Sequence, residues 1–256
     1  RQAGVVVRTK TRIERRVYAR ADAFIVLSPP FADILVRHFG IPREKIHVIP
    51  GGVDVPRYAI TDTRASCRER LGWPADRPIV LSVRRLMRRM GLDALIAATL
   101  EIRAQIPDIL VLIAGTGPIE GELRQQIVAL GLQDHVRLLG FVPDGDLPAA
   151  YRAASLTVVP THALEGFGLI VAESLAAGTA CLVTPVGGLP AAVEALSPAL
   201  VLRGADAASI ADGVIGALSG TRLMPDAEAC REFARQHYDW PVIAARVRAV
   251  YEAVQR

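Results

Sequence analysis

The chain alternates between short apolar runs and longer segments in which apolar residues recur every three or four positions. Short apolar runs bounded by Gly, Pro or polar residues are typical of buried strands, and the longer spacing is typical of helices packed by one face. Six strands are predicted: Ile79–Val83, Ile109–Ala114, Val136–Leu139, Leu156–Val159, Ala180–Thr184 and Ala199–Leu202. The predicted helices are Leu92–Ala104, Glu120–Leu130, Leu147–Ala153, Phe167–Ala177, Leu189–Ala195 and Ala207–Leu218.

This alternation of strand and helix predicts the fold class. Strands that alternate regularly with helices form a parallel sheet covered on both faces, so we expect an α/β protein with a doubly wound, six-stranded Rossmann-like sheet. Ligands of such sheets bind beyond the carboxyl ends of the strands. The loops that follow the predicted strands are therefore the places to look for chemistry.

The first part of the chain has a different pattern. It predicts a helix over Arg8–Arg20, a strand over Ala23–Leu27, a helix over Pro29–Phe39 and a strand over Lys45–Ile49. Two strands and two helices do not bury a stable sheet by themselves. We therefore expect residues 1–54 to be the closing portion of another Rossmann-type domain.

Composition favours a protein with a large core and without a membrane span. Hydrophobic residues make up 51% of the chain, and the longest apolar candidate, Leu175–Val193, is interrupted by Gly and Pro, whereas a span needs about 18 or more apolar residues. Cys67, Cys181 and Cys230 are odd in number and widely spaced, so they predict neither a disulfide framework nor a metal cluster. A cytoplasmic location is the expectation.

Positive charge is concentrated at the start of the chain, although the formal net charge is only +4. The basic residues of this segment are Arg1, Arg8, Lys10, Arg12, Arg15, Arg16 and Arg20. Two interpretations stay open: a solvated helix face, or a surface for anionic lipid or an acidic acceptor, which would add peripheral contact with the inner face of the membrane. No nucleic acid partner is expected, because the basic cluster has almost no interleaved aromatic residues and no recognisable fold motif of nucleic-acid-binding proteins.

The most informative segment lies between Glu165 and Glu173, after the predicted strand Leu156–Val159. A glycine-bearing turn leads into a helix, whose start offers unpaired N–H groups and the positive end of a dipole to a phosphate. A carboxylate before the turn and another inside the helix could hold hydroxyls at both ends of a bound nucleotide sugar. Two glutamates at this spacing are common by chance, so the context has to supply the specificity.

That context resembles a known signature. The Gly-Phe-Gly-Leu turn between Glu165 and Glu173, and the Ser-Leu-Ala-Ala-Gly run after them, resemble the Glu-x7-Glu motif of retaining glycosyltransferases of the glycogen-synthase-like group. The resemblance covers nearly the whole chain and includes Ile49–Asp54, where the family has Asn at the position of Gly51. It implies the carboxyl-terminal half of the two-Rossmann GT-B architecture, with no cofactor and no catalytic metal.

The resemblance also implies a division of the chain. Residues 1–54 would be the remnant of the amino-terminal, acceptor-side domain, and residues 55–76 would be an interdomain linker. Residues 77–237 would form the nucleotide-sugar donor-binding domain. Residues 238–256, introduced by Tyr238-Asp239-Trp240, would form a helix that crosses back towards the first domain.

Four arginines follow the first strand of the predicted sheet: Arg84, Arg85, Arg88 and Arg89. Positive charge at a strand end suits a diphosphate, whose developing charge such a transfer must stabilise. The family has Gly-Arg-Leu, three residues and Lys-Gly here, so Arg85 matches the phosphate-binding and catalytic Arg, whereas Met90 stands at the Lys position. Either Arg89 or Arg88 substitutes for that Lys, or turnover is reduced or absent; a merely solvated loop is the other interpretation.

Two further loops carry candidate donor contacts. Gly115 and Gly117 match a Gly-x-Gly-Pro motif of the family near the donor; a nicotinamide fingerprint would follow the first strand instead, and a plain glycine-rich turn is the other interpretation. The resemblance assigns backbone groups of Phe141 and Val142 to the nucleobase. Asp144–Asp146 imitates a metal-binding Asp-x-Asp motif, but a turn followed by a helix N-cap explains it better.

The resemblance gives the two glutamates separate roles. Glu165, in the loop, would be free to reach the hexose ring and is the second catalytic candidate with Arg85, whereas Glu173 would hold ribose hydroxyls; a paired helix glutamate is the alternative for Glu173. We expect the loop histidine His162 to have no catalytic part. The remaining donor contacts would come from the turn and the helix start: Gly166, Phe167, Gly168, Leu169 and Ile170.

The predicted function is transfer of a sugar, most simply a hexose, from a nucleotide-diphosphate sugar with retention of anomeric configuration. The acceptor is a sugar, a lipid-linked sugar or a small molecule, and its site would lie mostly outside this chain, so the isolated chain should have low activity. One rival is a non-catalytic or impaired relative of the same fold. Another is a different sugar-nucleotide enzyme, such as an epimerase or phosphorylase.

Overall fold

The computed structural model of the protein describes residues 2–255. Its centre is a parallel sheet of five strands in the order β5-β4-β3-β6-β7. The strands are β3 (Ile79–Val83), β4 (Leu110–Ala114), β5 (Val136–Gly140), β6 (Leu156–Val159) and β7 (Cys181–Val183). The fold class predicted from the alternation of strands and helices is thus confirmed.

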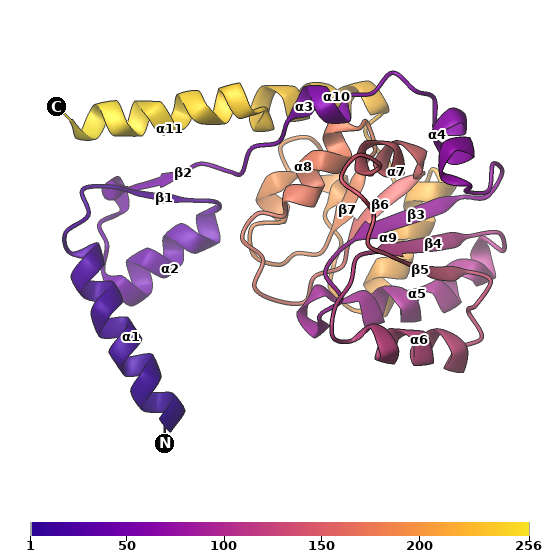
Figure 1. The fold of residues 1–256 in the computed structure, drawn as a ribbon, viewed down its shortest axis with the longest axis horizontal. Coiled ribbons are helices and arrows are strands. Elements are labelled where there is room, and N and C mark those ends of the chain that lie inside the picture. Colours follow the sequence, from indigo (N-terminus) through magenta and orange to yellow (C-terminus); the bar gives the residue numbers. More distant parts are fainter. Residues whose placement is uncertain (1, 256) are drawn as a thin grey trace.

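Helices cover both faces of this sheet (Figure 1). One face carries α3 (Val55–Tyr58), α7 (Leu147–Ala153), α8 (Leu169–Ala176) and α10 (Ala227–Tyr238). The opposite face carries α5 (Leu92–Gln105), α6 (Glu120–Ala129) and α9 (Ala207–Ser219). A further helix, α4 (Arg64–Leu71), packs against α7 through Cys67.

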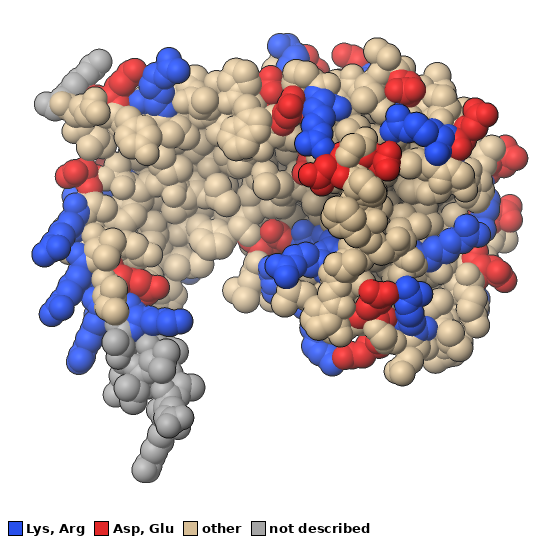
Figure 2. Space-filling view, viewed as in Figure 1, with Lys and Arg blue, Asp and Glu red and all other residues tan. Residues whose placement is uncertain are grey.

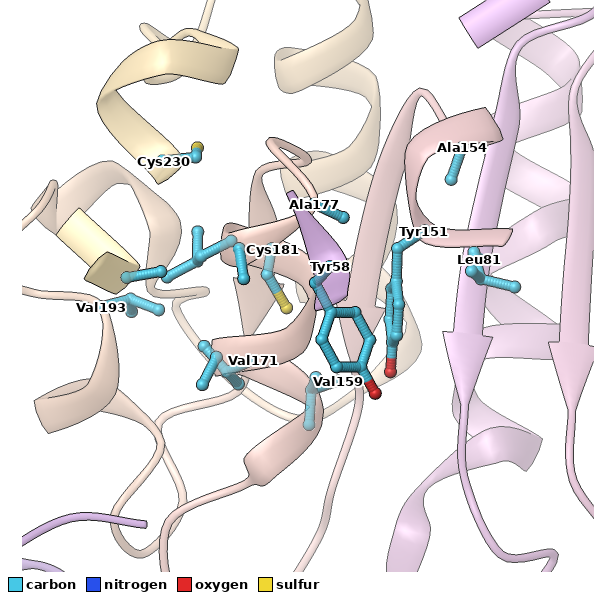
Figure 3. Close-up of a cluster of buried hydrophobic side chains, with 14 of the residues drawn as sticks. Tyr58, Leu81, Tyr151, Ala154, Val159, Val171, Ala177, Cys181, Val193 and Cys230 are labelled. Carbon is cyan, nitrogen blue, oxygen red and sulfur yellow. The ribbon is translucent and has the colours of Figure 1, made fainter. Parts of the chain in front are cut away.

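The strands are apolar throughout because both of their faces are covered. Every residue of β4 is buried, which is the pattern of a parallel strand between two helix layers and not the alternation of a half-exposed one. Figure 3 shows Leu81 of β3 near Tyr58 and Tyr151, which come from two helices of one face. Burial of a side chain such as Leu81 contributes about 1.5–3 kcal/mol to the free energy of unfolding.

The segment before the sheet forms a small separate layer. It contains α1 (Gln2–Tyr18), β1 (Phe24–Val26), α2 (Pro29–Phe39) and β2 (Ile46–Val48), and β1 pairs with β2 in parallel. The ring of Tyr18 packs edge-on against Phe24 and Phe39, with centroids 5.5 and 4.9 Å away. Figure 1 shows this layer set apart from the sheet domain.

The last helix, α11 (Trp240–Val254), returns from the sheet domain to this layer (Figure 1). Its Ile243 and Val250 are buried against Ile49, and the Arg246 guanidinium donates to the Val48 carbonyl at 3.0 Å. Beside this contact, the Val53 N–H donates to the Tyr238 carbonyl at 2.8 Å. The chain therefore passes between the two layers at neighbouring points before and after the sheet.

Two predicted elements need correction. The sixth strand, Ala199–Leu202, is absent from the sheet: Pro198–Leu200 is a 3-10 turn, and only Val201 pairs, through a single bridge to Val183. Proline cannot donate to a strand ladder, which explains why the pairing is so short. The helix predicted over Leu189–Ala195 is likewise only a 3-10 turn, Pro190–Ala192.

Two regions hold more helix than the pattern predicts. The residues expected to form a plain linker contain α3 and α4, and α10 precedes the last helix without having been predicted. Within residues 2–255, no helix is both long and apolar enough to cross a bilayer.

Candidate functional site

The loops at the carboxyl ends of the central strands surround the candidate site. The chain continues from β3 towards β4 and β5 on one side, and returns to place β6 and β7 on the other. The crevice between β3 and β6 is therefore the point where such folds bind ligands. A cavity of about 420 Å³ opens beside it. It is lined by Val83, Arg84, Arg85, Ala114, Gly115, Thr116, Gly117, Phe141, Val142, Asp144, Leu147 and Ile170.

Six of the predicted site residues lie together in this cavity lining: Arg85, Gly115, Gly117, Phe141, Val142 and Ile170. The Arg85 side chain is exposed. The Phe141 ring is 72% exposed, so the side chain, and not only the backbone, is available to a ligand. An exposed guanidinium and an exposed ring in one cavity suit a ligand with an anionic part and a flat part.

Gly115 is required by the way two loops pack below this cavity. Its φ is +133°, and a Cβ at this position would lie 1.9 Å from the Arg84 carbonyl oxygen. The Arg84 N–H donates to the Ala114 carbonyl at 2.8 Å, so the loops after β3 and β4 stay in register. The glycine-rich turn is therefore explained by packing as well as by its place in the lining.

Glu165 does not have the free carboxylate expected of it. The Arg84 Nη2 atom donates to Glu165 Oε2 and to Thr161 Oγ1. The side chains of Arg84 and Glu165 are only 7% and 14% exposed. A guanidinium buried at a strand end requires an anionic partner, and the loop after β6 supplies it.

The backbone on both sides of Glu165 is fixed by neighbouring loops. The Gly188 N–H donates to the Glu165 carbonyl at 3.0 Å, and a Cβ on Gly187, whose φ is +57°, would lie 2.1 Å from that carbonyl oxygen. The Arg89 guanidinium donates to the Leu164 carbonyl at 2.9 Å. Arg89 thus fixes the loop that carries Glu165. The sequence suggests a phosphate contact for Arg89 but gives no sign of this structural one.

The turn after Glu165 leads into α8, which begins after Gly168. First-turn N–H groups of a helix lack partners within the helix, so those of Leu169 and Ile170 are available to an anion beside the cavity. Phe167 is different, because its side chain is 4% exposed and its ring packs edge-on against Tyr238, with centroids 5.1 Å apart. Only the backbone of Phe167 can serve a ligand.

Glu173 is held by two phenols. The Tyr151 hydroxyl donates to Glu173 Oε2 at 2.7 Å, and the Tyr58 hydroxyl is a second hydrogen-bond partner. Figure 3 shows the two hydroxyls pointing the same way. Burial raises the pKa of the Glu173 carboxyl above its ordinary value, and the hydrogen bonds from the phenols and the charge of Arg57 only partly oppose this.

Comparison with known proteins assigns the chain to a family. The sequence profile described as "Glycosyl transferases group 1" matches residues 63–237, and that described as "Glycosyltransferase Family 4" matches residues 4–57. The chain belongs to the glycosyl transferases group 1 family. Its architecture is accordingly that of a GT-B glycosyltransferase, as the resemblance implied.

Individual relatives agree with this assignment. The chain is 36% identical, over 217 residues, to a D-inositol 3-phosphate glycosyltransferase of Nocardia farcinica; the match covers 82% of this chain and 47% of the relative. The chain thus spans about half the length of that curated relative. Sucrose-phosphate synthase from Thermosynechococcus elongatus is similar in structure, with a TM-score of 0.81 and 29% identity over 96% of this chain and 62% of that one.

A third similar structure is Anabaena HepE in complex with UDP-glucose. Its TM-score is 0.79 and its identity 23%, and the match covers 96% of this chain and 67% of that chain. At this level of identity the similarity concerns the fold. The match extends over nearly the whole of this chain.

Arg88 and Met90, both in the loop after β3, lie away from the cavity lining. Arg88 pairs with Glu122 Oε2 of α6 at 2.8 Å, on the surface. Met90, at the position where the resembled signature has Lys, is 5% exposed and packs into the core beneath α5. Neither residue brings charge to the strand ends.

The remaining polar candidates are accounted for locally. His162 Nε2 lies 3.5 Å from Asp93 Oδ1. Asp146 stands at the N-cap of α7, although its side chain makes no capping hydrogen bond. Among the described residues no group of three or more His, Cys, Asp or Glu side chains is placed to hold a metal ion.

Basic side chains gather on the small layer before the sheet, as Figure 2 shows. In the part of α1 whose side chains the structure describes, Arg12, Arg15 and Arg16 are exposed, as is Arg20 just beyond it. Arg1 and Arg8, which the sequence also assigns to this basic segment, lie outside the residues whose side chains are described. Exposure fits both the solvated face and the anionic surface considered for this segment.

Proposed function

We propose that this chain forms the donor site of a glycosyltransferase that moves a sugar from a nucleotide-diphosphate sugar to an acceptor, with retention of anomeric configuration. The observation that carries this proposal is the cavity at the ends of β3, β4 and β5, with Arg85 in its lining and the start of α8 at its border. The complex of the similar HepE structure with UDP-glucose supports a nucleotide sugar as the ligand.

The diphosphate would lie between Arg85 and the first turn of α8. Two independent kinds of hydrogen-bond donor lie there: the Arg85 guanidinium on the loop after β3, and the backbone N–H groups of Leu169 and Ile170. Both favour an anion with several acceptor oxygens. The nucleobase would then extend towards Phe141 and Val142 at the end of β5.

The hydroxyls of the donor would engage the two glutamates. Glu173, inside α8, would accept from ribose hydroxyls, and Glu165 would face the transferred sugar while its carboxylate is held by Arg84. Transfer breaks the bond between the anomeric carbon and the leaving phosphate oxygen, whose electron pair remains on the nucleoside diphosphate. The acceptor hydroxyl bonds to that carbon and loses its proton, and the cationic site stabilises the charge left on phosphate.

The acceptor side belongs to the rest of the architecture. We propose that residues 1–54 are the end of an acceptor-side domain, that residues 55–76 link it to the donor domain at 77–237, and that residues 238–256 return to it. The acceptor would be a sugar, a lipid-linked sugar or a small molecule. Exposed arginines of α1 would bring the protein to an anionic membrane surface at its cytoplasmic face.

Calorimetric titration with UDP, GDP, ADP and the matching monophosphates tests the donor site. We expect one nucleoside diphosphate to bind more tightly than its monophosphate, because the second phosphate reaches Arg85 and α8. An Arg85→Gln variant should lose at least tenfold in affinity for that diphosphate, as expected for one charge-assisted contact. Absence of heat with every diphosphate would contradict the proposal.

A non-catalytic relative remains the second candidate, because Met90 is buried where the resembled signature has a lysine. An assay of donor hydrolysis, with free sugar released from a panel of nucleotide sugars as the readout, distinguishes the active transferase from the non-catalytic relative. The transfer proposal expects measurable hydrolysis by the wild type. Binding without any hydrolysis, by both wild type and Met90→Lys, would favour the non-catalytic relative.

A further inference from the structure

Arg84 is a buried cation at the point where the order of the strands in the sheet reverses. It follows directly after β3, and both of its acceptors, Thr161 Oγ1 and Glu165 Oε2, lie in the loop after β6. These two strands border the crevice in which such sheets bind their ligands. The Arg84 side chain is only 7% exposed. Burying a charged side chain is energetically unfavourable, so a functional role would explain its presence there.

The guanidinium still has hydrogen-bonding capacity. The hydrogen bonds to Thr161 and Glu165 use the same nitrogen, Nη2, and the buried Nε has no acceptor among the described residues. A buried donor without an acceptor destabilises the folded protein. Arg84 also belongs to the lining of the cavity, beside Gly115 and Thr116. An acceptor oxygen of a ligand in this cavity would accept a hydrogen bond from the Arg84 N–H groups that have no acceptor within residues 2–255.

The other cations of the same loop are occupied elsewhere. Arg88 pairs with Glu122 on the surface, and Arg89 donates to the Leu164 carbonyl. Met90 brings no charge and is part of the core. Of the loop from residue 84 to residue 90, the arginines that line the cavity are Arg84 and Arg85.

We propose that Arg84 is the second cation of the donor site: held by Glu165 and Thr161 through one nitrogen, it donates through its others to the diphosphate. This inference rests on the proposed donor site. Glu165 has a double part in it, because it orients the guanidinium and also neutralises it. Loss of the Glu165 charge should therefore strengthen the binding of a diphosphate that carries no sugar.

Binding of one nucleoside diphosphate and its monophosphate to three variants, measured by calorimetry, tests this. Arg84→Gln should lower the affinity for the diphosphate by about 10–100-fold and change the affinity for the monophosphate by no more than about twofold, since only the second phosphate is within reach of Arg84. Arg84→Lys should fall between. Arg88→Gln, which removes a surface cation of the same loop, is the matched control and should change neither affinity.

Glu165→Gln is a second arm of the test, in which Arg84 itself stays in place. It should bind the diphosphate several-fold more tightly than the wild type, and the diphosphate should raise its melting temperature more than that of the wild type. A structural role for the ion pair alone predicts no such gain. Wild-type binding with unchanged affinities in Arg84→Gln, or in Glu165→Gln, overturns the inference. Absence of binding to the wild type would instead overturn the donor site itself.

Discussion

The two glutamates of the signature are eight positions apart and live in opposite electrostatic surroundings. Glu165 is held by a guanidinium in a loop between strands, with both partners almost fully buried. Glu173 is held inside a regular helix by the hydroxyl of Tyr151 and that of Tyr58. The first carboxylate is hydrogen-bonded to a cationic group, whereas the second is hydrogen-bonded to neutral phenols.

This difference indicates how one motif can serve two tasks. A carboxylate hydrogen-bonded to a guanidinium is fixed in direction, which suits a group that faces a reacting sugar. A buried carboxylate against phenols is less readily ionised, and burial raises its pKa, so that it exchanges hydrogen bonds with hydroxyls at low electrostatic cost. Each environment can be removed separately.

The largest effect is expected from removing one side of the charged pair. Glu165→Gln leaves the Arg84 guanidinium buried without a counter-charge, so the free energy of unfolding should fall by about 3–5 kcal/mol. Urea unfolding of the ligand-free protein measures it. Glu122→Gln, whose partner Arg88 is 78% exposed, is the control and should cost at most about 1 kcal/mol. Equal losses in the two variants would contradict a special role for burial.

The neutral pair should be weaker. Tyr151→Phe removes the hydroxyl that donates to Glu173 and keeps the ring in the core, so we expect a loss of about 1.5–3 kcal/mol in urea unfolding. Tyr251→Phe removes the hydroxyl of a tyrosine that is 63% exposed and should leave stability within about 0.5 kcal/mol. If Tyr151→Phe is as stable as the wild type, Glu173 does not depend on this bond.

Glu173 should also give the stability of the protein a pH dependence. Its ordinary pKa of 4.5 is raised by burial, so above that value the folded protein retains a proton that the unfolded chain has released. The free energy of unfolding therefore falls as pH rises towards the raised pKa, by at most about 1.4 kcal/mol per pH unit. Glu173→Gln should lose this slope in a pH series of urea unfolding. An unchanged slope in the variant would assign the effect to another group.

The smallest effect concerns the loop that carries Glu165. Leu164 has a φ of +58° and is 82% exposed, so it adopts a left-handed conformation without burying much surface. Leu164→Gly should raise the free energy of unfolding by about 0.5–1 kcal/mol, because glycine adopts this conformation without strain. Leu223, which is 87% exposed and has no positive φ, is the control: Leu223→Gly should give no gain. A gain of the same size in both variants would show that the strain at Leu164 is not the cause.

Much of the fold could be predicted because it depends on local pattern. The strands β3 and β6 begin and end at the predicted residues, since a run such as Ile79–Val83 is apolar and sharply bounded. The sixth strand could not be predicted, because a proline next to an apolar run decides its pairing. The loops of the site could also be located from local pattern, because glycines and the turn before α8 are visible in the sequence.

The electrostatics of the site could not be predicted, because they join residues far apart in the chain. Arg84 and Glu165 are 81 positions apart, and Tyr151 and Glu173 are 22 apart. The sequence shows four arginines in one loop, but not which of them the strand end buries. Nothing in the residues near Tyr58 indicates that its hydroxyl reaches α8.

The most direct test of the central claim is a crystal structure of the protein soaked with the nucleoside diphosphate that binds best. We expect the terminal phosphate to lie within about 3.2 Å of the Leu169 or Ile170 N–H nitrogens and of the Arg85 guanidinium, and to accept a hydrogen bond from Arg84 as well. A phosphate bound elsewhere, for example in the groove between α6 and β5 at Arg124 and Arg137, with the strand ends empty, would contradict it.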